Sequence, residues 1–123
     1  MPKIPAVFSR IKQETLGLKY DLSFALIKPA AMRRAMKYKK MSTGKVSNVL
    51  AFPLSKTSGE VLICKAAAKP FSSDYLLIHA LLHLKGYKHG ARMDSEECRI
   101  LRTFGLNIHE HPYYRNRRRH TPR

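Results

Sequence analysis

The sequence predicts an α+β domain in which a small mixed sheet of three to four strands packs with about four helices. Four segments carry apolar residues at helical spacing, and three short segments between them have apolar residues that alternate or run together. At 123 residues, 44% of them hydrophobic, the chain is long enough for one domain with its own core. We place this domain at residues 1–109 and treat residues 110–123 as a basic tail that is disordered when unbound.

The first three elements are a helix, a strand and a second helix. Apolar residues at helical spacing within residues 6–16 predict the first helix, which stops at Gly17. Apolar and polar residues alternate over residues 20–26, and this pattern predicts a strand with one buried face. Pro29 suits the first turn of a helix, and residues 30–39 after it include strong helix formers.

Two strands follow. Residues 46–52 (VSNVLAF) read as a strand, and Pro53 is expected to close it. Residues 55–59 are expected to form a loop, and residues 60–64 a short apolar strand. Because little chain separates the two strands, we expect them to pair as a hairpin or as neighbours.

Two helices complete the domain. Ser72 or Ser73 can cap the first of them, which should run to Lys85. The second is expected over residues 93–104, because acidic residues occupy its first turn and an apolar stripe follows them.

The chain is strongly basic, with 24 Lys and Arg against 8 Asp and Glu and a formal net charge of +16. No acidic residue lies between Asp21 and Glu60, and the charged residues after position 110 are all cationic. Such charge predicts a polyanionic partner, bound with an affinity that depends little on sequence and falls with salt. The residues that we expect to contact this polyanion are Arg33, Lys37, Lys40, Lys45, Asn48, Arg115, Arg117, Arg118 and Arg119.

An anionic membrane surface is the competing partner for this charge. No stretch has the roughly 18 apolar residues of a membrane-spanning helix, and residues 1–13 lack the pattern of a signal peptide. We therefore expect a cytoplasmic protein that does not bind membranes. Cys64 and Cys98 lack metal-binding spacing and are expected to be buried, unpaired thiols, although Cys98 could face solvent.

The most informative segment is HALLHLKGYKH, from His79 to His89. His79 and His83 are four residues apart, so on a helix their rings project from one face. Gly86 can end that helix in the left-handed conformation, and the reversed chain could bring His89 over the other two rings. Three imidazoles around one point leave a fourth tetrahedral position open, as in catalytic zinc sites. The sequence thus predicts one zinc ion held by His79, His83 and His89.

Other interpretations of these histidines remain open. Each ring could be a satisfied core residue or a surface residue, but the leucines around His83 indicate a buried helix, where a shared ion would supply a polar partner. Three imidazoles also suit iron, nickel or copper. His109 and His111 form a second pair near the tail, and we expect both to be incidental surface residues. The acids that could orient a ligand histidine are Asp74, Asp94, Glu96 and Glu97.

Peptide hydrolysis is a weak candidate for the chemistry of this site. Metalloproteases with the H-E-x-x-H motif have a glutamate directly after the first histidine, and this chain has Ala80 there. Phosphodiester hydrolysis fits better, because a metal ion and cationic side chains can stabilise the charge that develops on phosphate.

The segment from His79 to His89 resembles the H-G-x-L-H-L-x-G-Y-D-H signature of the YbeY family, zinc-dependent endoribonucleases of ribosomal RNA maturation. Weaker similarity extends over residues 20–106 and includes VLAFP, residues 49–53, beside the family's D-V-L-S-F-P element. The resemblance implies a single-strand-specific endoribonuclease that acts on ribosomal RNA or ribosomal particles. It implies that the three histidines bind zinc and that Lys39 stands where the family has a functional arginine.

The chain departs from the family pattern at four positions: Lys39 replaces arginine, Asn48 replaces aspartate, Ala80 replaces glycine and Lys88 replaces aspartate. Lysine keeps the positive charge but loses the bidentate phosphate geometry of guanidinium. Zinc binding should therefore survive more surely than catalysis. The alternative function is a non-catalytic RNA-binding factor of ribosome assembly, in which zinc only braces the fold.

Overall fold

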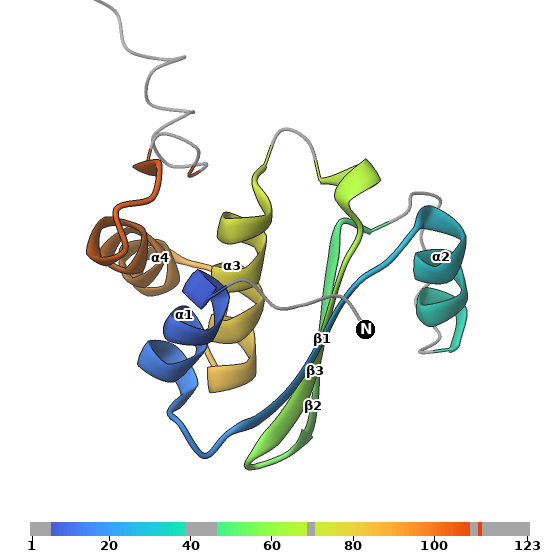
Figure 1. Ribbon diagram of the computed structural model, residues 1–123, viewed down its shortest axis with the longest axis horizontal. Coiled ribbons are helices and arrows are strands. Elements are labelled where there is room, and N and C mark those ends of the chain that lie inside the picture. Colours follow the sequence, from blue (N-terminus) through green and yellow to red (C-terminus); the bar gives the residue numbers. More distant parts are fainter. Residues whose placement is uncertain (1–5, 39–46, 69–70, 109–110, 112–123) are drawn as a thin grey trace, which may run out of the picture.

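The computed structural model describes residues 6–38, 47–68, 71–108 and 111. Within these residues, four α-helices and a three-stranded sheet confirm the predicted α+β class (Figure 1). The elements in chain order are α1 (Ala6–Leu16), β1 (Asp21–Leu26), α2 (Pro29–Tyr38), β2 (Val49–Ser55), β3 (Ser58–Ile63), the short 3-10 helix η1 (Lys65–Ala67), α3 (Ser73–Lys85) and α4 (Ala91–Thr103).

The sheet has the order β1-β3-β2 and is mixed. Strand β1 runs parallel to β3, with Asp21 opposite Ser58 and Leu26 opposite Ile63. Strand β2 runs antiparallel to β3, and only Lys56 and Thr57 separate the two strands in the chain. The expected pairing of these two strands is therefore confirmed as a tight hairpin.

The predicted end of β2 at Pro53 is wrong, because the strand continues to Ser55. Strand β2 lies at an edge of the sheet, where a residue without an N–H group can be accommodated because one side of the strand has no ladder to complete. The register also shifts between Pro53 and Ser55, an irregularity that relieves the pairing next to the proline. The loop expected over residues 55–59 is thus reduced to a two-residue turn.

The helices form two layers around the sheet. Helices α1, α3 and α4 lie on one side, with α3 against the sheet and α4 against α3, and α2 lies on the other side (Figure 1). The larger core forms around α3, and a smaller one joins Met32 and Met36 of α2 to Leu50 and Cys64. Both cysteines are buried and unpaired, as expected.

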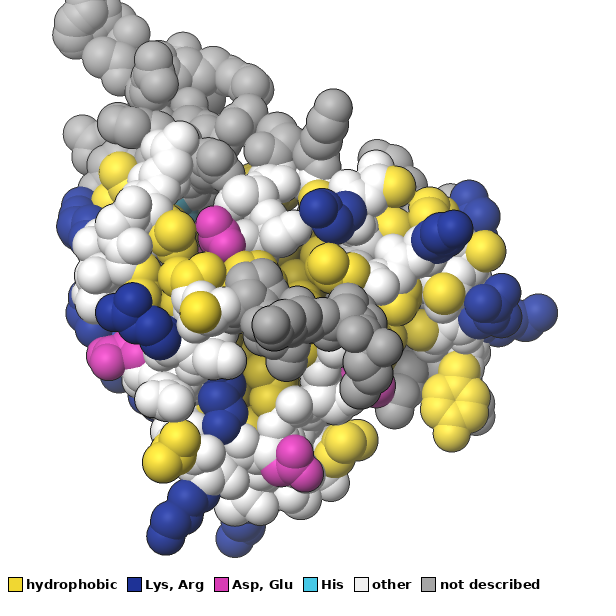
Figure 2. Space-filling model, in the orientation of Figure 1, with side chains coloured by type: hydrophobic (Ala, Val, Ile, Leu, Met, Phe, Trp, Pro, Cys, Tyr) yellow, Lys and Arg dark blue, Asp and Glu magenta, His cyan; other side chains and the backbone are white. Residues whose placement is uncertain are grey.

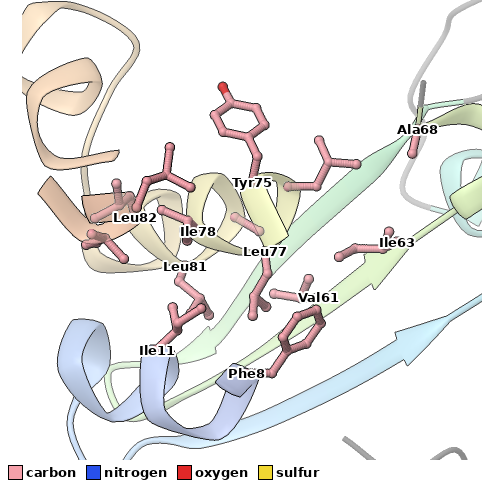
Figure 3. Close-up of a cluster of buried hydrophobic side chains, with 14 of the residues drawn as sticks. Phe8, Ile11, Val61, Ile63, Ala68, Tyr75, Leu77, Ile78, Leu81 and Leu82 are labelled. Atoms are coloured by element: carbon pink, nitrogen blue, oxygen red, sulfur yellow. The ribbon is translucent and has the colours of Figure 1, made fainter. Parts of the chain in front are cut away.

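Helix α3 is buried on nearly all sides. Figure 3 shows Leu77 and Leu81 among the apolar side chains of β3 and α1, whereas Tyr75 points away from them. At 13 residues α3 is about 20 Å long, and none of the helices in the described residues is long and apolar enough to span a membrane. Because Leu77 and Leu81 face β3 and α1, the side of α3 that carries Tyr75 is the side available to form a site with α4.

Gly59 in β3 lies where a larger side chain would collide with its neighbours. A Cβ atom there would overlap the Tyr20 hydroxyl and come within 3.0 Å of Leu84 Cδ2. We expect Gly59→Ala to lower the free energy of unfolding by about 1–3 kcal/mol, because the neighbours must shift to admit the methyl group. Urea denaturation monitored by circular dichroism would measure this loss.

Tyr20 supplies the control for that prediction. Its hydroxyl is buried and has no hydrogen-bond partner among the described residues, so Tyr20→Phe removes no hydrogen bond and should be neutral or slightly stabilising. Gly59→Ala should then cost less in the Tyr20→Phe background than in the wild type. An equal cost in both backgrounds would contradict the steric explanation.

Candidate metal centre

The structure brings together the three histidines singled out in the sequence. The Nε2 atoms lie 3.1 Å apart for His79 and His83, 3.0 Å for His83 and His89, and 3.4 Å for His79 and His89. A tetrahedral zinc ion with Zn–N bonds of 2.0–2.1 Å needs its ligand nitrogens about 3.3 Å apart. The three imidazoles therefore fit around one metal ion, as the sequence predicted.

The ends of α3 set the position of these rings. Ser72 caps the helix as expected, since its hydroxyl accepts a hydrogen bond from the Tyr75 N–H at 3.1 Å. At the other end Gly86 adopts the predicted left-handed conformation, with φ of 109°. The Gly86 and Tyr87 N–H groups donate to the carbonyls of His83 and Leu82, which reverses the chain and returns His89 to the other two rings.

Hydrogen bonds at the far nitrogens determine the tautomers of two rings. His79 Nδ1 lies 2.6 Å from Glu97 Oε2, and His83 Nδ1 lies 3.2 Å from the Tyr87 carbonyl oxygen. Because both partners accept hydrogen bonds, each Nδ1 carries a proton, and in the neutral form of each ring the Nε2 lone pair faces the cluster. Burial, together with the neighbouring His79, lowers the pKa of His83 and favours its neutral form. Lone pairs that face each other at 3.1 Å repel, and a shared cation would remove that repulsion.

Glu97 is the acidic residue that orients the cluster. It lies on α4, is 1% exposed, and accepts hydrogen bonds from His79 on one oxygen and from His111 Nε2, at 2.6 Å, on the other. Burial alone would raise the pKa of Glu97, but the hydrogen bonds from His111 and His79 outweigh burial and lower it, so the carboxylate stays charged. The Tyr75 hydroxyl lies 3.5 Å from the same carboxylate, and burial together with this negative charge raises the pKa of Tyr75.

Two of the other acids proposed for this role, Glu96 and Asp94, have no hydrogen bond to the three clustered histidines, although Asp94 lies in one group with Glu97 and His111. Glu96 bonds to Arg99 on the exposed side of α4, and Asp94 Oδ1 lies 3.8 Å from His111 Nε2. Glu97 could have been singled out in the sequence, because it falls in the buried stripe of α4 between Met93 and Ile100. A carboxylate in such a stripe needs hydrogen-bond donors around it.

The prediction that His111 is an incidental surface residue is wrong. Its side chain is fully buried, donates to Glu97 and packs edge-on against Tyr75, with ring centroids 5.5 Å apart. The chain after α4 turns back at Ile108, whose carbonyl accepts the His111 N–H, and this turn delivers the ring to Glu97. The H-x-H spacing contains no sign of that turn. His109 lies outside the described residues.

The basic residues expected to contact RNA are only partly described. Arg33 and Lys37 are exposed on α2, across the sheet from α3, and the Asn48 carbonyl accepts the Cys64 N–H just before β2. Figure 2 shows Lys and Arg side chains spread over the visible face, with few acidic ones. Apart from His111, the tail lies outside the described residues, so the division of the chain near residue 109 stays a prediction. Lys39 and the other residues expected to contact RNA also lie outside them: Lys40, Lys45, Arg115, Arg117, Arg118 and Arg119.

Comparison with known proteins places this geometry in a family. The family model described as Endoribonuclease YbeY matches residues 4–107. A curated relative named Endoribonuclease YbeY, from Thiobacillus denitrificans, is 32% identical over 89 residues, with 56% of this chain and 58% of the relative covered. The chain thus spans less than two thirds of the length of that relative. Because the family model matches most of the sequence, including all three clustered histidines, this chain belongs to the YbeY family.

Proposed function

We propose that this chain is a zinc-dependent endoribonuclease that cleaves single-stranded RNA during ribosomal RNA maturation in the cytoplasm. The observation that carries the proposal is the set of 3.0–3.4 Å separations among the Nε2 atoms of His79, His83 and His89. Membership of the YbeY family supports an RNA substrate, and the formal net charge of +16 supports a polyanion. In this proposal the three histidines are the ligands of one zinc ion.

The chemistry of the site divides between the metal and the chain. Zinc, when bound, supplies Lewis acidity that polarises a phosphate oxygen and acidifies water. Glu97 and the Tyr87 carbonyl hold the rings of His79 and His83 with their Nε2 lone pairs inward, which keeps these donors basic. His89 is exposed, so a strand of RNA can approach the centre from that side.

Cationic side chains would hold the substrate. Lys39 follows α2 and corresponds to the family's functional arginine, so we assign it a contact with phosphate, made as a point charge. Binding through phosphates requires no base-specific contact and should weaken steeply with salt. We assign the same role to Arg33, Lys37, Lys40, Lys45, Asn48, Arg115, Arg117, Arg118 and Arg119.

His83→Ala tests the enzymatic role. We expect the variant to fold and to bind single-stranded RNA like the wild type, but to lose cleavage, because two imidazoles would not hold the metal in place. Gel analysis of an unstructured RNA and of a duplex, with protein of verified zinc content, would measure cleavage and strand preference. Cleavage that persists in His83→Ala would rule out this centre as its source.

The second candidate is a non-catalytic, zinc-braced factor of ribosome assembly. It is favoured by the charge next to the centre, where Lys88 precedes His89 and replaces the aspartate of the family signature. The positive charge of Lys88 opposes metal binding. The loss of the aspartate also removes a carboxylate that could accept or donate a proton during the reaction. This candidate predicts that zinc-loaded wild-type protein binds RNA but never cuts it. Removal of zinc should then lower the thermal stability of the protein, and the RNA should remain intact with or without zinc.

A further inference from the structure

An open cleft of about 590 Å³ lies along the loop that joins α3 to α4. His89 lines this cleft, and its Nε2 atom lies 3.0 Å from that of His83. The cleft and the histidine cluster therefore share one side chain. A molecule seated in the cleft would lie directly beside the candidate metal centre.

The cleft is lined by exposed positive charge. Lys85 is in part engaged, because it adds to the effect of Arg99 in lowering the pKa of Glu96. Lys85, Lys88 and Arg92 contribute to its wall, and none of the described residues that line it is acidic. All three side chains belong to exposed residues, and none makes a hydrogen bond or ion pair with another described residue. Arg99, further along α4, shows the contrast, because it is bound to Glu96 and Glu14. The charges of the cleft thus remain available to an anionic ligand.

The chemistry of the cleft suits a single nucleic acid strand. Three cations spread over residues 85–92 can contact successive phosphates, whereas one free phosphate would occupy only a small part of the volume. Tyr87 also lines the cleft, although part of its side chain packs against the core, and an aromatic ring among cations is a combination by which proteins hold unpaired nucleotides. In the family signature the position of Lys88 is an aspartate, so the positive charge of Lys88 distinguishes this chain from that signature.

We propose that the cleft along residues 85–92 is a phosphate-binding subsite that holds single-stranded RNA on one side of the bond to be cut. The inference rests on the proposed function, since it concerns the strand that would reach the same centre. Lys85, Lys88 and Arg92 bind phosphates, and the strand then passes over His89. The subsite makes binding strongly dependent on salt and sets the path of the strand relative to the metal.

The test measures RNA binding and does not depend on cleavage. Fluorescence anisotropy would give the affinity of a short 2′-O-methyl RNA for the full chain at several salt concentrations. The combined variant carries Lys85→Ala, Lys88→Ala and Arg92→Ala. The slope of log K against log salt is negative, and in this variant it should become shallower by about 2, because each lost contact with a single strand removes about 0.7. Elemental analysis should show the same zinc content as in the wild type.

Matched variants complete the design. Lys65→Ala removes one positive charge on η1, at the opposite end of α3 from the cleft, and should leave the slope unchanged. Lys88→Asp, a single exposed change, should make the slope shallower even if the combined variant folds poorly. A combined variant and Lys88→Asp that both keep the wild-type slope would overturn the proposal. Displacement of the RNA by millimolar inorganic phosphate, with equal potency in wild type and combined variant, would also overturn it.

A wild-type protein that binds RNA through the cleft but never cuts it would refute the proposed function alone. The subsite would then be a binding element of an assembly factor. If the protein cleaves RNA but the three substitutions leave the slope of log K against log salt unchanged, the subsite alone would be refuted. The two proposals therefore fail in distinguishable ways.

Discussion

His79→Ala is expected to reduce the zinc content from about one equivalent per chain to none and to abolish RNA cleavage. His79 supplies one of three Nε2 atoms that lie 3.0–3.4 Å apart, and it is the ring that Glu97 orients. The two imidazoles left behind cannot complete the three-nitrogen set of a catalytic zinc site. Elemental analysis of protein purified without added metal, together with a cleavage assay on single-stranded RNA, would measure both losses.

The matched control for this variant is His120→Ala, which removes one imidazole from outside the described residues. It should retain one equivalent of zinc and wild-type cleavage. Circular dichroism would confirm that His79→Ala still folds, as expected for alanine within a helix. A folded His79→Ala protein that keeps stoichiometric zinc would show that the metal binds elsewhere, and the proposed function would lose its basis.

Substitutions of Glu97 are expected to have the second largest effect. Glu97→Gln keeps the size of the side chain, but its amide cannot accept from His79 on one side and His111 on the other without turning an N–H₂ group toward a donor. We expect zinc affinity to fall about 10- to 100-fold, the usual consequence of losing a carboxylate that orients a metal-binding histidine. Competition with a chromogenic chelator would measure this affinity.

Glu97→Ala should in addition lower the free energy of unfolding by about 3 kcal/mol, because it leaves buried donors of His79 and His111 without an acceptor. Urea denaturation would measure the loss. The lowered pKa of Glu97 means that its stabilising effect is present above its unfolded-state pKa and disappears as the pH falls through the folded-state value. The acid side of the stability profile should therefore be flatter in Glu97→Gln than in the wild type.

Glu96→Gln is the control for both Glu97 variants. Glu96 is the preceding residue on α4 and bonds to the exposed Arg99. Exposed ion pairs contribute at most about 1 kcal/mol, so this change should alter stability little and zinc affinity not at all. Equal losses of zinc affinity in Glu96→Gln and Glu97→Gln would indicate a general effect of charge instead of the specific contact with His79.

The part of the centre that could be predicted from sequence is local. Ser72 and Gly86 bound α3 through hydrogen bonds within a few residues, and the four-residue spacing of His79 and His83 follows from helical geometry. The return of His89 likewise follows from local bonds, the chain reversal at Gly86 and the contacts of Tyr87 with Leu82 and His83. Such features need no knowledge of how distant segments pack.

The part that could not be predicted depends on contacts between segments far apart in the chain. The bond from His111 to Glu97 requires the turn at Ile108, and the strand through Pro53 depends on the position of β2 at an edge of the sheet. Spacing within the sequence does not specify either arrangement. The apolar stripe of α4 identifies Glu97 as buried, but only the assembled fold shows which donors surround it.

Glu97 joins His79 to His111 through one carboxylate. This contact links metal binding at His79 to the attachment of the segment around His111. The segment around His111 helps to fix the position of Glu97, and Glu97 in turn orients the ring of His79. A partner that pulled the segment away would weaken the hold on a metal without touching any of its ligands. Thermodynamic reciprocity then requires that metal binding raise the free energy needed to detach the same segment from the domain.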